Sequence, residues 1–195
     1  GYGRGTNPLL SRQPGIVAFS KVLTESNTTH KSVPMLMSDI TACNFDSIYH
    51  QKGIITAFKE AGYQTAFFSN QRYNHSFIDF FGKEADTFDF IKEDSLDSAY
   101  NPSDDELLAL VAKELSKGNQ KQFIVLHTYG SHLNYRERYP SEDAFFLPDY
   151  PVEAEVKYRD NLVNAYDNTI RYTDSFLSRL IHMLEEQHVD AAMLY

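Results

Sequence analysis

The sequence predicts an α/β fold in which a mostly parallel central sheet carries helices on both faces. Short apolar segments of strand-like composition alternate along the chain with segments whose apolar residues repeat at helical spacing. This alternation is typical of parallel strands that are joined by covering helices. The segment at 122–127, QFIVLH, supports the same class, because an unbroken apolar run is expected of a strand buried on both faces.

Composition narrows the range of functions. With 195 residues, of which 42% are hydrophobic, the chain is long enough for one domain with a substantial core. A net charge of -9 argues against a nonspecific nucleic-acid binder, which needs a cationic surface. The single Cys43 excludes an intramolecular disulfide and a zinc site made of several cysteines. The chain has no apolar run long enough to predict a membrane span, and no signal peptide.

The elements of the first half follow in order. Residues 1–14 are rich in glycine and proline, which predicts turns, and they lead into a predicted strand at 15–23. After a polar turn, apolar residues at helical spacing predict a helix at about 29–41. A second helix is predicted at 52–61 and ends at Gly62, the residue type that commonly follows a helix.

The elements of the second half are predicted by the same criteria. Ser103 and Glu106 form a capping box at the start of a helix that ends at Gly118. The segment at 128–151 is long, aromatic and polar without periodicity, which is typical of a functional or mobile loop. The other predicted elements are strands at 64–69, 87–91, 122–127 and 191–195, a helical turn at 76–82 and a long helix at 156–186.

Three polar segments leave predicted strands in the same sense, at 26–29, 70–74 and 128–134. In a parallel sheet the carboxyl ends of the strands meet at one rim, where ligands usually bind. We therefore expect these segments to lie together and to form the site.

The first of these segments begins the helix within TESNTTHKSVPMLMS, at 24–38. Such a helix start leaves free backbone N–H groups and the positive end of the helix dipole beside a hydroxyl group. That arrangement can seat a phosphate and can stabilise an alkoxide. Judged on this stretch alone, Thr28 or Thr29 is more often a helix cap than a nucleophile.

Four stretches together resemble a known family. They are YGRGTNP at 2–8, FSKVLTESNTTHKSVPMLMS at 19–38, FIVLHTYGSHLNYRERYP at 123–140 and YDNTIRYTDSFLSRLI at 166–181. In this order they are similar to the catalytic domain of bacterial phosphoethanolamine transferases, which belong to the alkaline phosphatase and sulfatase superfamily. The resemblance covers nearly the whole chain. It implies a single sulfatase-like catalytic domain at 1–195 that lacks the ends of the full domain.

The resemblance also implies an activity and a location. Members of the family transfer phosphoethanolamine from phosphatidylethanolamine to lipid A, a core sugar or another envelope glycan. They use zinc and a threonine nucleophile that carries the phosphoethanolamine as a covalent intermediate. They are anchored in the bacterial inner membrane and face the periplasm, so we expect membrane helices to precede Gly1.

The site residues follow from matched motifs. The family's nucleophile stands three residues before a Ser-Val-Pro triplet, so Ser32, Val33 and Pro34 place it on Thr29, which would also be a zinc ligand. His132, in the Gly-Ser-His motif, matches a histidine that contacts the phosphoethanolamine group or a second zinc. Asn70 matches, more weakly, a polar substrate contact.

Several positions depart from the family pattern. A glutamate before the Tyr-Gly turn and an Asp-His pair after the strand at 191–195 complete the family's metal shell, and both positions lie outside this sequence. We therefore expect the 195 residues alone to bind zinc poorly and to be inactive. Glu25 and Met35 occupy the positions of a disulfide that often brackets the nucleophile, so we expect packing alone to hold that turn.

Other polar residues have simpler interpretations. We expect His127 to be structural, and we expect Asp104, Asp105 and Glu106 to be a helix N-terminus rather than a carboxylate site. Asp167, Asn168 and Asp174 should face solvent or support neighbouring loops. Aromatic and basic residues form a last cluster, made of Tyr135, Arg136, Arg138 and Tyr139. This cluster could bind a phosphate or a glycan, and it could equally be a solvated loop.

Two alternatives to the transferase remain. A phosphoglycerol transferase shares the fold and a threonine nucleophile. A non-catalytic envelope-binding domain would have kept the fold and lost the metal shell. A sulfatase activity is disfavoured, because the turn lacks the Cys-x-Pro-x-Arg pattern that is converted to formylglycine.

Overall fold

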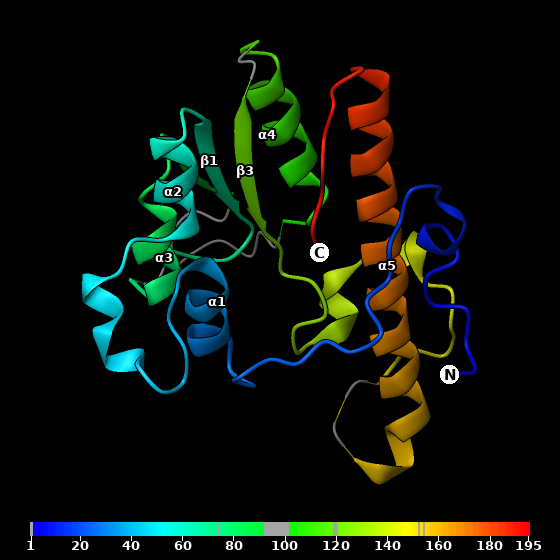
Figure 1. Ribbon diagram of the computed structural model, residues 1–195. Helices are drawn as coiled ribbons and strands as arrows, with labels where there is room; N and C mark the ends of the chain where they lie inside the picture. Colours follow the sequence, from blue (N-terminus) through cyan, green and yellow to red (C-terminus); the bar gives the residue numbers. More distant parts are fainter. Residues whose placement is uncertain (1, 74, 92–101, 119–120, 152, 154) are drawn as a thin grey trace. The chain divides into compact units, whose positions relative to one another are not determined.

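The computed structural model describes residues 2–73, 75–91, 102–118, 121–151, 153 and 155–195 (Figure 1). The chain forms two compact units. One, the sheet unit, consists of Ala18–Pro102 and Ala109–Thr128. The other, the long-helix unit, consists of Gly1–Val17, Ser103–Leu108 and Tyr129–Tyr195. Each unit has its own packing.

The sheet unit contains a parallel three-stranded sheet. Its strands are β1 (Gln64–Ser69), β2 (Thr87–Phe90) and β3 (Gln122–His127), in the order β2-β1-β3. Phe67 of β1 lies opposite Phe88 of β2 and Val125 of β3, and both pairings are parallel. The central strand β1 is buried from Thr65 onward, whereas all of β3 is half-buried, so the prediction that 122–127 is buried on both faces is wrong. The predicted parallel sheet is confirmed.

Short helices pack around one apolar core in this unit. They are α1 (Thr29–Met37), α2 (Ile54–Glu60), α3 (Phe77–Gly82) and a 3-10 helix at Phe45–His50, within a segment where we predicted no helix. A further helix, α4 (Glu106–Leu115), extends into the unit from Ala109. The core is Met37, Ile40, Ile48, Ile55, Phe67, Ile78 and Phe81.

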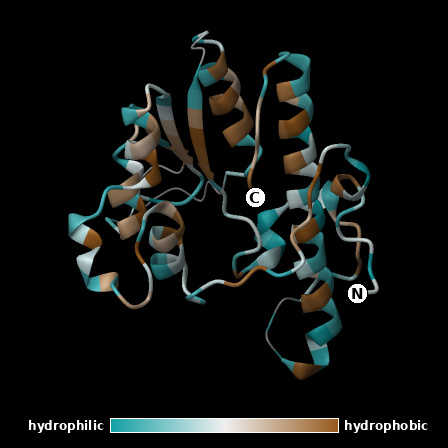
Figure 2. Cartoon of the chain, viewed as in Figure 1, coloured by the Kyte–Doolittle hydropathy of each residue, from teal (hydrophilic) through white to brown (hydrophobic). Residues whose placement is uncertain are grey.

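The long-helix unit is built on α5 (Arg159–Glu186), which a 3-10 helix at Val156–Tyr158 precedes. Brown and teal residues alternate along this helix in Figure 2, as expected of an amphipathic helix. Its buried residues are of two kinds. Apolar ones such as Phe176 and Leu180 continue the predicted helical stripe, and polar ones such as Asp167 and Asn168 form hydrogen bonds with the rest of the unit.

Two predicted strands are wrong. Residues 15–23 and 191–195 adopt no strand in the part of the chain that the structure describes, and most of their large apolar side chains are exposed. Val17 is 77% exposed and Leu23 is 97% exposed. Apolar composition alone does not make a strand, because a strand needs a neighbouring backbone to complete its hydrogen bonds.

No helix among the described residues is both long enough and apolar enough to cross a membrane.

Candidate functional site

Thr29 is the first residue of α1. Thr28 precedes the helix in an extended conformation, and its hydroxyl lies 3.1 Å from the Ser26 hydroxyl instead of capping a helix amide. The amides of Lys31 and Ser32 both donate to the Thr28 carbonyl, at 3.0 and 2.9 Å. The amides of Thr29 and His30, which come before these two, have no helical carbonyl to which they can donate. The Thr29 side chain is exposed beside them.

The charges at this helix start favour an anion. The first turn of α1 contains no acidic residue, and the two residues that follow Thr29 are His30 and Lys31, both exposed. A lysine at a helix N-terminus opposes the helix dipole, so it adds to the positive potential there. Free amides, the dipole and a cationic side chain together suit a phosphate group.

Hydrogen bonds hold the turn in front of α1 and join it to the segment that follows the helix. The Glu25 carboxylate accepts the amide of Ala42 at 2.5 Å, and the Thr24 hydroxyl donates to the Ser26 carbonyl at 3.0 Å. Met35 packs against the core of the sheet unit. The prediction that packing alone holds this turn is therefore wrong, because Thr24 bonds Ser26 within the turn and Glu25 bonds Ala42 beyond α1.

Asn70 lies directly after β1 and is buried, with 1% of its surface exposed. Its amide N–H donates to the His127 carbonyl at 2.9 Å, and its side-chain Nδ2 donates to the Pro102 carbonyl at 3.1 Å. The Gln71 side chain donates to the Thr128 carbonyl at 3.2 Å. The polar segments after β1 and β3 thus meet at one rim, as predicted for these two, whereas the third predicted segment, 26–29, follows no strand among the described residues. In this position Asn70 supports the rim, and contact with a ligand would need its side chain to become accessible.

His127 ends β3 as the structural residue that we expected. Its Nδ1 lies 3.0 Å from the Ser69 hydroxyl, and its ring packs 6.2 Å from the ring of Phe67. The contact fixes the ends of two neighbouring strands.

His132 belongs to the long-helix unit, whereas Thr29 and Asn70 belong to the sheet unit. Its side chain is exposed, and its ring meets the Tyr129 ring edge-on at 5.3 Å. Gly130, between them, has a φ of 55°, a left-handed conformation that glycine adopts at little cost. The Gly-Ser-His motif is therefore a tight turn that presents the imidazole outward.

The aromatic and basic cluster that follows is internal. The Arg136 guanidinium lies 2.9 Å from the Asp149 carboxylate and donates to the Ser141 hydroxyl at 2.6 Å. The Tyr139 hydroxyl donates to Asp149 at 2.8 Å, and burial raises the pKa of this tyrosine. The Arg138 side chain is 7% exposed and lies over the Tyr129 ring, 3.9 Å from its centroid. The burial of Arg138 and Tyr139 shows that the solvated-loop interpretation is wrong, and the phosphate or glycan grip stays a prediction.

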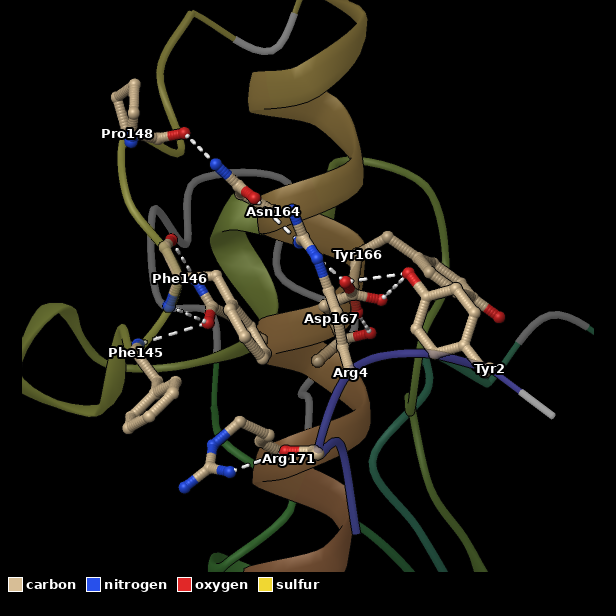
Figure 3. A network of polar contacts seen from close by, with 12 residues as sticks. Tyr2, Arg4, Phe145, Phe146, Pro148, Asn164, Tyr166, Asp167 and Arg171 are labelled. Atoms are coloured by element: carbon tan, nitrogen blue, oxygen red, sulfur yellow. Dashed lines mark hydrogen bonds and ion pairs between the residues drawn. The ribbon is translucent and has the colours of Figure 1, made fainter.

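Helix α5 fastens the N-terminal segment through a buried carboxylate (Figure 3). Asp167, 1% exposed, accepts the Tyr2 hydroxyl at 2.8 Å and pairs with Arg4 at 2.7 Å. Arg4 also donates to the Asn164 side chain at 2.7 Å. The motifs at 2–8 and 166–181, far apart in sequence, thus contact one another directly.

Two more buried polar residues of α5 support loops. Asn168 accepts the amides of Phe145 and Phe146 at 3.0 and 2.8 Å, and Asp174 accepts the amides of Leu9 and Leu10 at 2.9 Å each. The expectation that these residues buttress loops is confirmed, and their burial excludes the alternative that they face solvent.

Sequence reasoning missed two residues beside the Gly-Ser-His turn. Asp104 accepts backbone amides of that turn, and Thr169 contacts the hydroxyl of Ser131. No sequence signal separates Asp104 from Asp105, because both carboxylates precede the same helix.

A metal site would need ligands in addition to Thr29. Among the described residues, no group of three or more His, Cys, Asp or Glu side chains is placed to hold a metal ion. These residues do not by themselves fit a zinc centre.

Comparison with known proteins gives a consistent result. The model of the sulfatase family matches residues 1–195. Phosphoethanolamine transferase EptA of Escherichia coli K12 is 29% identical over 95% of this chain and 34% of its own length. EptA from Neisseria meningitidis, solved as an integral membrane lipooligosaccharide phosphoethanolamine transferase, has a TM-score of 0.78 at 29% identity, over 96% of this chain and 35% of that one.

The periplasmic domain of E. coli EptC, solved with zinc, has a TM-score of 0.83 at 24% identity, over 96% of this chain and 55% of that domain. At this identity the likeness concerns the fold alone. The chain spans about a third of the length of the curated relatives that it matches.

Proposed function

Since this chain belongs to the sulfatase family, we propose that it carries the nucleophile of a phosphoethanolamine transferase. The reaction moves phosphoethanolamine from phosphatidylethanolamine to a lipid A or envelope glycan acceptor through a covalent intermediate on Thr29. The observation that carries this proposal is the exposed Thr29 hydroxyl at the cationic start of α1. Relatives that are named for this activity match 95% of the chain or more.

The first step is a displacement at phosphorus. The Thr29 oxygen forms a bond to phosphorus as the bond from phosphorus to the diacylglycerol oxygen breaks, and the hydroxyl proton passes to the leaving oxygen. In the second step the acceptor hydroxyl displaces Thr29, which regains a proton. Charge that develops on the phosphoryl oxygens is stabilised by the free amides and the dipole at the start of α1. His132 contacts the phosphoethanolamine group, and Asn70 remains the weaker candidate for a substrate contact.

We include zinc as the cofactor in this proposal because the family that the chain resembles uses zinc. The Thr29 hydroxyl offers one oxygen, and the described residues gather no further cluster of metal ligands. The other ligands in this proposal therefore come from residues outside those described, and the steps above depend on this chain's own groups.

The proposal extends to the place of the chain in the whole protein. Residues 1–195 form part of a single catalytic domain on the periplasmic side of the inner membrane, attached through a membrane region. Support comes from the N. meningitidis relative, which is an integral membrane protein.

The test is headgroup transfer by the full-length protein with Thr29→Ala. We expect turnover to fall by about a thousandfold or more, because the nucleophile is lost. Thr28→Ala is the matched control, and we expect it to retain turnover, since the Thr28 hydroxyl contacts the Ser26 hydroxyl of the preceding turn. Circular dichroism checks that both variants fold. Turnover that survives in Thr29→Ala and disappears in Thr28→Ala would place the nucleophile on Thr28.

A further inference from the structure

The turn that presents His132 is held mainly through its backbone. The His132 side chain is exposed, and its ring contact within the unit is the edge-on packing against Tyr129. A tight turn with a left-handed glycine keeps one shape only when neighbouring groups satisfy its amides. The position of the imidazole therefore depends on what binds the backbone of Tyr129 and Gly130 and the side chain of Ser131.

Asp104 binds two consecutive amides of this turn. Its Oδ1 accepts the Tyr129 N–H at 2.7 Å and its Oδ2 accepts the Gly130 N–H at 2.9 Å. The residue is 7% exposed, so water competes little for these bonds. Hydrogen bonds to a carboxylate are stronger than those between neutral groups, and two parallel ones also fix an orientation.

Thr169 of α5 holds the next residue. Its hydroxyl lies 2.6 Å from the Ser131 hydroxyl and 2.6 Å from the Tyr166 carbonyl, and the residue is 1% exposed. Thr169 is the donor in both contacts, so its single hydroxyl proton is shared between the Ser131 hydroxyl and the Tyr166 carbonyl. Consecutive residues before His132 are thus fixed to the start of α4 and to the middle of α5.

We propose that Asp104 is a positioning residue that holds the Tyr129–Gly130 backbone so that His132 meets the phosphoethanolamine group, with Thr169 as a second anchor. This inference rests on the proposed function for its effect on transfer. Asp104 acts through the turn and touches no substrate. Its removal misplaces the imidazole, and a misplacement of about 1 Å at a reacting group can reduce the rate by about 100-fold.

The activity test uses full-length protein with Asp104→Ala, alone and combined with His132→Ala. We expect kcat/KM to fall by about 10- to 100-fold in the single variant. In the His132→Ala background we expect no further loss, because no imidazole remains to be positioned. Equal losses in both backgrounds, or no loss in either, would overturn the proposal, since a general structural defect gives losses that add.

Asp105→Ala is the matched control. Asp105 precedes the same helix but pairs with Arg179, and both side chains are partly exposed. We expect kcat/KM to stay near the wild-type value. Asp104→Asn keeps one acceptor oxygen and should give a loss between those of wild type and Asp104→Ala, which separates positioning from misfolding.

A second readout does not depend on activity. Hydrogen–deuterium exchange of a peptide covering 128–132 should be faster in Asp104→Ala, whereas a peptide within β3 should exchange as in wild type. Unchanged exchange at 128–132 would overturn the anchoring. If the wild-type protein transfers no headgroup, the proposed function fails, but this exchange result still decides whether Asp104 holds the turn.

Thr169→Val tests whether Thr169 helps to hold the turn. Thr173→Val, the same substitution one turn further along α5, is its control. The Thr173 hydroxyl donates to the Thr169 carbonyl at 3.0 Å and not to the turn. Only Thr169→Val should raise exchange at 128–132, and an equal rise in both variants would remove Thr169 from the proposal.

Discussion

The backbone at Gly130 and the side chain at Thr29 show how single residues shape the site. At Thr29, a polar turn followed by Pro34 predicts a helix start, and α1 begins at that residue. Pro34 itself is the sixth residue of α1, inside the helix, where the N–H that it lacks would have donated to the His30 carbonyl. This part of the site was therefore predictable from the sequence.

Glu25 and Asp104 were not predictable. Glu25 bonds an amide seventeen positions away, and Asp104 bonds amides in another segment. A carboxylate has the same local signature whether it faces solvent or accepts a distant amide. Only the fold brings donor and acceptor together.

Gly130→Ala tests the turn at the residue scale. With a φ of 55°, a side chain at this position costs about 1–2 kcal/mol in backbone strain. We expect the free energy of unfolding to fall by about that amount in urea titrations, since the strain is absent from the unfolded chain. Gly3→Ala is the control, because Gly3 has open space around it, and a loss as large there would contradict this explanation.

At the scale of elements, strands with partners were predicted well. The bounds of β1 and β3 match the prediction, and β2 differs by one residue at its end. Residues 15–23 and 191–195 have similar composition but form no strand among the described residues. The sequence pattern shows which side chains are apolar. A strand also requires the backbone of an adjacent strand, with which it forms hydrogen bonds.

For helix α5, the sequence predicts the helix but not which of its polar residues are buried. Its length and apolar stripe follow from spacing, but the burial of Asp167, Asn168 and Asp174 does not. These residues are buried because the N-terminal segment and the loop at 145–146 supply donors for them.

Asp167→Asn tests this fastening. The change removes the charge that pairs with Arg4 while preserving the shape of the side chain. Because the Asp167 carboxylate is buried, we expect the loss of its charge to lower the free energy of unfolding by about 1–3 kcal/mol. Asp160→Asn, in the exposed first turn of the same helix, should change it by less than about 0.5 kcal/mol. Thermal or urea unfolding measures both, and equal effects would show that Asp167 contributes nothing specific.

At the scale of the whole molecule, the parallel sheet and the meeting of the β1 and β3 ends at one rim were predictable. The division into two units was not, because it depends on contacts between segments more than a hundred residues apart, such as Arg4 with Asp167.

Zinc binding tests whether the 195 residues contain enough ligands to form a metal centre. The described residues gather no cluster of three or more metal-binding side chains, so we expect the 195-residue chain to bind zinc weakly. Isothermal titration calorimetry with zinc chloride should show no tight stoichiometric event. Tight binding of one zinc per chain would show that these residues do form a metal centre.

The central claim is that Thr29 carries the phosphoethanolamine, and the most direct test is to find it there. Full-length protein is incubated with phosphatidylethanolamine without acceptor, digested, and mapped by tandem mass spectrometry. The account predicts phosphoethanolamine on Thr29 and none in Thr29→Ala. Modification of Thr28 instead, or an unmodified Thr29 in a protein that transfers the headgroup, would contradict it.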